Sequence, residues 1–283
     1  TENKQLEFKS DITNTFLKTV SAFANYNGGK IIFGVEDDGE VVGLNNPVQA
    51  CLDIENKIND TIRPQPQYEL SVQDVEKTVT LMVEPGVHKP YTYKSKAYRR
   101  NDTATIEVDE LELSRLILQG KNINYENLTA ADQNLRFRIL EERAKSEIGI
   151  RSLNKDVLKT LNLYNDENGY NHAAELLADI NHFPGIDIAR FGDSISVILK
   201  RVTFENESIL SELENAVEVY RDFYQYEEID GMSRKKVERI PEEAFREAIA
   251  NALIHRTWDV NAQIRVLMFE DRIEISSPGG LPS

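Results

Sequence analysis

A basic segment in an acidic chain is the first group of residues whose types and spacing could do chemistry. The 283-residue chain has a formal net charge of −15. Residues 88–101, HKPYTYKSKAYRRN, contain no acidic residue, and their cations are Lys89, Lys94, Lys96, Arg99 and Arg100. Tyr91, Tyr93 and Tyr98 alternate with these cations. Cations contact phosphates and aromatic rings stack on bases, so the pattern is typical of a nucleic-acid surface. A solvated hairpin with packed tyrosines and snorkelling lysines would give the same pattern.

A polar stripe on a predicted helix over residues 241–256 is the second group. Glu247, Asn251 and His255 follow one another at intervals of four, which places all three on one side of a helix. A carboxylate and an amide one turn apart could orient a water and coordinate Mg²⁺. His255 could lie beside a nucleotide phosphate or pack against the helix. An exposed polar face explains the same spacing.

The elements that must position these residues begin with a helix over residues 11–25. Its apolar residues recur every three or four positions. Gly28 and Gly29 stop this helix, and residues 30–35 read as a strand covered on both faces. Asp38-Gly39 is typical of a hairpin turn. A phosphate-binding P-loop is excluded for Gly28-Gly29-Lys30, because the order is helix then strand and Ile31 follows the lysine.

The rest of the chain alternates helices and strands, so we predict an α+β protein. Helices are expected at 47–62, 107–118, 133–145, 154–161, 171–180 and 207–226, and strands at 68–72, 78–83 and 195–202. The expected domains are 1–120, a connecting region 121–205, and a last domain 206–283, with residues 120–127 as the linker. The chain starts without Met and ends inside a motif, so we expect a fragment of a longer protein.

Composition limits the class of protein. The single cysteine, Cys51, excludes an internal disulfide and a Cys-rich zinc site, and no apolar run approaches the length of a membrane span. We therefore expect a cytoplasmic protein with no membrane partner. The charge of −15 opposes long-range attraction to nucleic acid, but salt screens charges beyond about 8 Å, so a local basic patch can outweigh it.

Two runs, Leu6-Glu7-Phe8-Lys9 and LKTVSAFANYNGGKIIFGVEDDGEVVGL at residues 17–44, resemble the Schlafen AlbA-type domain. This domain stands at the front of many bacterial transcriptional regulators and in animal Schlafens. The resemblance implies a compact α+β domain that binds nucleic acid. Our first expectation is a homo-oligomeric DNA-binding regulator whose five cations in residues 88–101 contact phosphate; RNA is the less favoured partner.

The same resemblance implies an alternative, a metal-dependent ribonuclease. RNA-cleaving Schlafens hold a divalent metal with three acidic residues, and the matching positions here are Glu2, Glu7 and Glu36. On a straight strand Glu2 and Glu7 would face opposite sides, so a bend would be required. The competing interpretation is that Glu7 and Lys9 form an exposed strand face.

The C-terminal region carries a second resemblance. Residues 246–259, REAIANALIHRTWD, and 264–282, IRVLMFEDRIEISSPGGLP, resemble the RecG-related, ATPase-like region of the same regulators, which is similar to the Bergerat ATP-binding fold. The resemblance implies that Glu247 activates water and that Asn251 binds the Mg²⁺ of ATP. Gly279 and Gly280 stand where that fold has Asp-x-Gly-x-Gly, but the adenine-binding aspartate is replaced. An ATP-responsive interaction module without nucleic-acid binding is the third reading.

Overall fold

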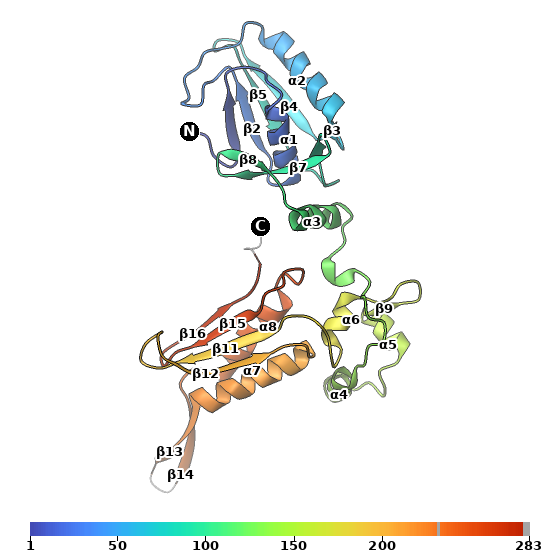
Figure 1. The fold of residues 1–283 in the computed structure, drawn as a ribbon, viewed down its shortest axis with the longest axis vertical. Coiled ribbons are helices and arrows are strands. Elements are labelled where there is room, and N and C mark those ends of the chain that lie inside the picture. The colour runs from blue at the N-terminus through green and yellow to red at the C-terminus, as the bar shows by residue number, and fades with distance from the viewer. Residues whose placement is uncertain (231–232, 280–283) are drawn as a thin grey trace. The chain divides into compact units, whose positions relative to one another are not determined.

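The computed structural model describes residues 1–230 and 233–279, and it confirms the predicted α+β class (Figure 1). Contacts within the chain divide it into two compact units, Thr1–Asn124 and Tyr125–Ser283. Among the helices of the described residues, none combines the length and the apolar character that crossing a membrane requires.

The first unit is built on a four-stranded sheet of order β1-β2-β5-β4. Its strands are β1 (Leu6–Lys9), β2 (Gly29–Phe33), β4 (Tyr68–Gln73) and β5 (Thr78–Val83). β1 runs parallel to β2, and the other neighbours are antiparallel. Ile31, Phe33, Val79 and Leu81 are fully buried, as expected for central strands.

A second sheet in the same unit contains the basic segment. It has the order β3-β6-β7-β8, with strands β3 (Ile62–Arg63), β6 (Thr92–Tyr93), β7 (Lys96–Asn101) and β8 (Ala104–Glu107). The unit's helices are α1 (Phe16–Asn25), α2 (Pro47–Thr61) and α3 (Glu110–Gly120). Helix α1 packs on β7 and is buried along nearly its whole length. It therefore joins the two sheets through one core.

The Gly28-Gly29 stop is confirmed. Gly28 has φ +69°, and its N–H donates to the Phe23 carbonyl at 3.0 Å, which closes the end of α1. A Cβ on Gly29 would lie 2.6 Å from the Phe23 ring, so the helix and β2 approach too closely for a side chain. Two expectations change in detail. Helix α1 starts at Phe16 instead of residue 11, and Asp38-Gly39 forms a turn flanked by one isolated bridge, Val35 to Val41.

The second unit opens with short elements, most of which pack around Leu158, Leu163 and Ala174. They are η1 (Tyr125–Asn127), α4 (Arg138–Glu147), α5 (Lys155–Thr160), β9 (Tyr164–Asn165), β10 (Gly169–Tyr170) and α6 (His172–Leu177). Asn154 and Asn171 cap α5 and α6 with their side chains. Helix α4 begins later than predicted, so the residues before it are free to line a cavity.

The larger part of the second unit is a sheet of order β12-β11-β15-β16 whose core is shared with two helices (Figure 1). The elements are β11 (Ile186–Phe191), β12 (Ile198–Phe204), α7 (Ile209–Tyr224), α8 (Glu242–Ile254), β15 (Ile264–Met268) and β16 (Ile273–Ser276). A separate hairpin pairs β13 (Gln225–Asp230) with β14 (Ser233–Glu238). Residues 186–204, which the sequence places in the connecting region, supply two strands of this sheet.

Candidate nucleic-acid interface

The basic segment forms a tight hairpin between β6 and β7. Its two-residue turn consists of Lys94 and Ser95, with φ values of +51° and +62°, as a twisted hairpin requires. Lys94, in the turn, and Lys96, directly after it, are both exposed. Lys18, from α1, extends over the Tyr98 ring with its Nζ 5.8 Å from the centroid. The fold thus brings a third lysine to this hairpin.

Three of the five predicted phosphate-binding cations already have acidic partners. Lys96 Nζ lies 2.7 Å from Glu107, and Arg99 Nε lies 3.0 Å from Glu112. Arg100 Nη1 donates to Glu7 Oε2 at 2.5 Å, and only 5% of the Arg100 side chain is exposed. The other two cations, Lys89 and Lys94, have no such acidic partner among the described residues.

Lys89 and Lys94 form no ion pair within the described part of the chain. Lys89 is half-buried and donates to Gln119 Oε1 at 3.3 Å, and burial lowers the pKa of its amine. Lys94 is exposed, with its Nζ 5.3 Å from the Tyr93 ring centroid. Lys94 is therefore the predicted cation best placed to meet a phosphate.

The tyrosines of the basic segment belong to the core. Tyr93 and Tyr98 are 4% and 7% exposed, and with Tyr91 they join the main cluster of the first unit. The prediction that Tyr93 and Tyr98 stack on bases is therefore wrong. The pleat turns their rings inward toward α1, where Ser21 Oγ accepts from the Tyr98 amide at 3.3 Å. The alternation of tyrosines with cations in residues 88–101 is therefore explained by packing of the strands against the core.

The three carboxylates of the ribonuclease alternative are engaged separately. Glu7 is 4% exposed, and it accepts from Arg100, from Lys9 at 2.9 Å and from Thr19 Oγ1 at 2.7 Å. The expectation that Glu7 lies on an exposed strand face is thus wrong, because these partners satisfy a buried charge. Glu2 accepts from the Phe8 amide at 2.8 Å, and Glu36 is exposed in a turn. No group of three or more His, Cys, Asp or Glu that could hold a metal occurs among the described residues.

The polar stripe of α8 is exposed as a whole. Glu247, Asn251 and His255 are all accessible, and His255 forms the C-cap of the helix. The segment that follows β16 returns to this end of α8. Ser277 Oγ donates to the Ala252 carbonyl at 3.1 Å, and a Cβ on Gly279 would lie 2.4 Å from Thr257 Oγ1. Gly280 lies outside the described residues.

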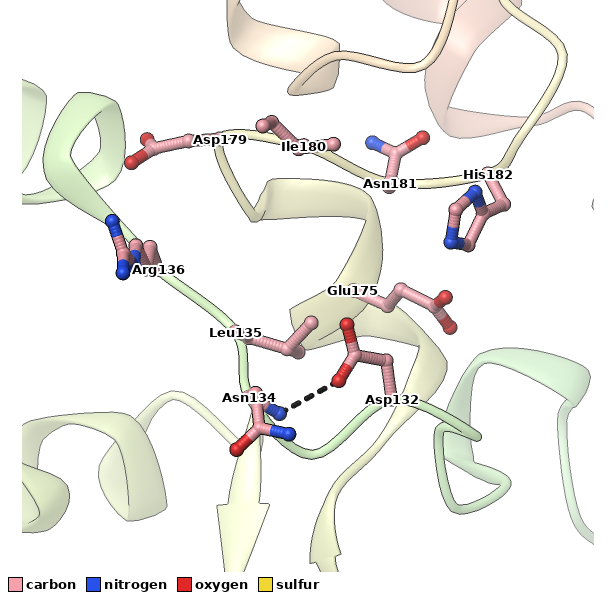
Figure 2. Close-up of a pocket in the computed structure, with 9 residues that line it drawn as sticks. All are labelled: Asp132, Asn134, Leu135, Arg136, Glu175, Asp179, Ile180, Asn181 and His182. Carbon is pink, nitrogen blue, oxygen red and sulfur yellow. Dashed lines mark hydrogen bonds between the residues drawn. The ribbon is translucent and has the colours of Figure 1, made fainter.

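A cavity of about 370 Å³ in the second unit has walls that no sequence motif indicated (Figure 2). The extended residues before α4 form one wall and the segment after α6 forms the other. Asp132, Glu175 and Asp179 line it, together with Arg136 and His182. These residues are scattered along the chain, so only the tertiary structure brings them together.

The carboxylates of this cavity differ in how they are satisfied. Both oxygens of Asp179 accept from amides that begin α4, at 3.0 and 2.9 Å, and Asp132 accepts from the Asn134 amide at 2.8 Å. Glu175 is 6% exposed and lies 3.0 Å from Nδ1 of His172, whose ring stacks on Tyr125. The carboxylates outnumber the cations, so this cavity favours a positively charged group over an anion.

Comparison with known proteins finds a family that is similar to most of the first unit. Residues 2–109 match the family described as Schlafen, AlbA_2. Among curated proteins, none matches the chain in sequence. The DIP2311 protein from Corynebacterium diphtheriae has a similar structure, with 22% identity over 99% of this chain and a TM-score of 0.50. The chain spans 62% of the length of that protein.

A second solved structure is the N-terminal domain of a RecG-related protein from Nitrosomonas europaea. The two chains are 24% identical, and the TM-score is 0.27. The matched region is 38% of this chain and 79% of the Nitrosomonas domain. The Corynebacterium structure supports the fold. The family match concerns residues 2–109, and this segment is therefore similar to the Schlafen AlbA_2 family.

Proposed function

We propose that this protein binds nucleic acid through its AlbA_2 domain, and that it does so as a DNA-binding regulator of transcription. The observation that carries the proposal is the AlbA_2 match over residues 2–109. The exposed lysines of the β6–β7 hairpin support it, because phosphate contacts supply most of the affinity of such proteins.

The contact surface in this proposal is the hairpin face, formed by Lys18, Lys94 and Lys96 around Tyr98. Lys18 and Lys94 are exposed and have no ion-pair partner within the described residues. Lys96 is paired with Glu107, but about half of each side chain is exposed to solvent. Such a pair contributes little to stability, so a phosphate can compete for the lysine. Arg100 has no place in this face, because its charge is already buried against Glu7.

The test is a fluorescence-anisotropy titration of labelled duplex DNA and single-stranded RNA at several salt concentrations in EDTA. We expect binding that weakens with salt, with a slope of about −0.9 per phosphate contact on DNA. The double variant Lys18→Ala/Lys94→Ala should bind more weakly and reduce the slope by about two contacts. Tighter binding to DNA than to RNA is expected for the regulator.

The matched control is Lys57→Ala/Lys159→Ala, which removes the same charge outside the hairpin face. Lys57 donates to Asn14, and Lys159 pairs with Asp166 in the second unit. Equal losses in both double variants would mean that only the total charge matters and would refute the hairpin face. Absence of binding at low salt would refute nucleic-acid binding itself.

A second candidate function is ATP binding with Mg²⁺ at the C-terminal end of α8. The observation that favours it is the packing of Gly279 on Thr257, beside the exposed stripe of Glu247, Asn251 and His255. A ligand that binds the folded state raises thermal stability. Mg-ATP should stabilise the wild type and fail to stabilise Asn251→Ala; no stabilisation of either would count against this candidate.

A further inference from the structure

Two adjoining cavities lie beside the Gly28-Gly29 turn of the first unit. One, of about 200 Å³, is lined by Lys4, Gln5, Tyr26, Asn27, Arg99 and Arg100 among others. The other, of about 440 Å³, shares the walls of Gln5, Asn27 and Gly28 and adds Lys30. The two cavities adjoin at these shared residues, and we call them together the glycine-turn hollow.

The glycine-turn hollow is lined by more cations than carboxylates, namely Lys4, Lys30, Arg99 and Arg100 against Glu84 and Glu112. Lys4 and Lys30 are exposed, and neither forms an ion pair within the described ranges. Arg100 forms part of the wall and is 5% exposed. Its partner Glu7 also pairs with Lys9, so one carboxylate faces two cations and leaves a positive charge uncompensated. The hollow is therefore suited to an anionic group.

Arg100 is held in a fixed position but retains an unused donor. Its guanidinium donates to Glu7, to Thr105 Oγ1 at 2.9 Å and to the Asn3 carbonyl at 3.1 Å. Its Nε is buried and has no acceptor among the described residues. A buried N–H without a partner is costly, and it indicates a group that a bound acceptor could satisfy.

The same hollow has groups that suit a planar base. Tyr26 lines it, and its hydroxyl donates to Glu112 Oε1 at 2.6 Å, which fixes the ring. Burial, and next this hydrogen bond, raise the pKa of Tyr26, so the ring stays neutral. The side-chain amides of Gln5 and Asn27 offer both donors and acceptors for a base edge. Aromatic rings with amides and cations are the usual components of nucleotide recognition.

We propose that the glycine-turn hollow binds a 5′-nucleotide, with its phosphate among Lys4, Lys30 and Arg99 and its base against Tyr26. The ligand chemistry is a phosphate joined to a nucleoside, supplied either by a free nucleotide or by the 5′ end of a nucleic-acid strand. The site shares no lysine with the hairpin face, so the two proposals stand or fall separately. Glu112 lines the same cavity and would hold Tyr26 and Arg99 in place.

The test is isothermal titration calorimetry of the purified chain with AMP, adenosine and inorganic phosphate as separate probes. We expect AMP to bind more tightly than either fragment. Lys4→Met and Gln5→Glu should each weaken AMP binding about tenfold or more, because they remove a charged contact or place a carboxylate in the wall. Both residues are exposed, so both variants are expected to fold, which circular dichroism and thermal melting would verify.

Two controls accompany this test. Lys57→Ala/Lys159→Ala, which changes no residue of a proposed binding site, should leave AMP binding unchanged. Oligonucleotides with and without a 5′-phosphate distinguish the two sources of ligand, since preference for the phosphorylated end would identify the strand. Lack of AMP binding at millimolar concentration, equal binding of AMP and adenosine, or unchanged affinity in Gln5→Glu would each overturn the proposal.

Discussion

Each unit of the molecule contains a buried glutamate and a buried arginine side chain whose charges interact, and the two pairs are arranged differently. In the first unit, Glu7 and Arg100 are in direct contact. In the second unit, Glu212 and Arg256 are 2% and 3% exposed, but Arg256 donates to the carbonyls of Pro184 and Ala262, each at 2.6 Å. Within the described ranges, Glu212 Oε2 and Arg256 Nε have no hydrogen-bond partner.

This difference shows that burial alone does not decide how a charge behaves. Burial, with Glu207 as the next cause, raises the pKa of Glu212 to about 8, against the opposing effect of Arg256. Burial also lowers the pKa of Arg256. Glu7, by contrast, accepts from Arg100, Lys9 and Thr19. Several charge-assisted hydrogen bonds to one carboxylate offset the cost of burying it.

The largest expected effect comes from breaking the directly paired set. Arg100→Ala should lower the free energy of unfolding of the first unit by about 3–5 kcal/mol, because it leaves Glu7 buried with less compensation. Hydrogen exchange of the β2 and β5 amides would measure this loss. The matched variant is Arg99→Ala, because more than a third of the Arg99 side chain is exposed in its pair with Glu112. It should lower the free energy of unfolding by less than about 1 kcal/mol. Equal losses would show that Glu7 does not depend on Arg100.

The second effect is a pH dependence of the second unit. The folded-state pKa of Glu212, about 8, lies above its ordinary value of 4.5, so the folded protein keeps a proton that the unfolded chain releases. Stability should therefore fall as pH rises from about 4.5 to about 8, by about 1.4 kcal/mol per pH unit at the steepest, and then become level.

Trp258, the only tryptophan and 5% exposed, reports unfolding of this unit by its fluorescence. Urea titrations at several pH values would measure how the free energy of unfolding changes with pH. The Glu212→Gln variant should lose most of this pH dependence. A Glu212→Gln variant that keeps the full pH dependence would show that another group is responsible.

A third and smaller effect is expected when either of two buried asparagines that hold loops is replaced. Asn25 Nδ2 donates to the Tyr91 carbonyl at 2.9 Å, and its Oδ1 accepts from the Tyr91 amide at 2.7 Å. Asn181 donates to the Glu207 carbonyl and accepts from the Phe183 amide, at 2.7 and 3.0 Å. Replacement of either by Ala should cost about 2 kcal/mol, since backbone groups lose their partners.

Hydrogen exchange would measure the Asn25→Ala variant, and Trp258 fluorescence would measure Asn181→Ala. We expect each loss to stay within the unit that carries the substitution. Destabilisation of both units by one substitution would contradict the division of the chain at residue 124.

The smallest effect is expected at exposed pairs of the second unit. Glu214 pairs with both Arg143 and Arg246, and all three side chains are about two-fifths exposed. Glu214→Ala should change the free energy of unfolding by less than about 1 kcal/mol, and added salt should reduce the difference further. A loss above 2 kcal/mol in the urea titration would mean that this network behaves like the buried pairs.

Local patterns were sufficient for most elements but not for their roles. The start of α2 at Pro47 and the stop at Gly28 follow from capping chemistry, and both were predicted. β11 was missed, because Asp187 and Arg190 interrupt its apolar run. In the structure, Asp187 is buried against Arg201, which explains a charge in a central strand.

The candidate site was only partly predictable for the same reason. Residues 88–101 stand out by composition, and Lys94 and Lys96 do lie on an exposed turn. Charge pairing was invisible, because the partners of Arg99 and Arg100 come from α3 and β1. Lys18 could not be placed either, since a single lysine in a buried helix carries no signal.

The sequence by itself determined the similarity of residues 2–109 to the AlbA_2 family, the α+β class and the short-range elements, because periodicity, glycines and caps act between near neighbours. Only the tertiary structure decided which cations are free. Glu7 and Arg100 are 93 residues apart, and their contact turns a predicted phosphate ligand into a buried structural pair. Pairing of distant charges depends on how the sheets and α1 pack, and that packing is a property of the whole domain.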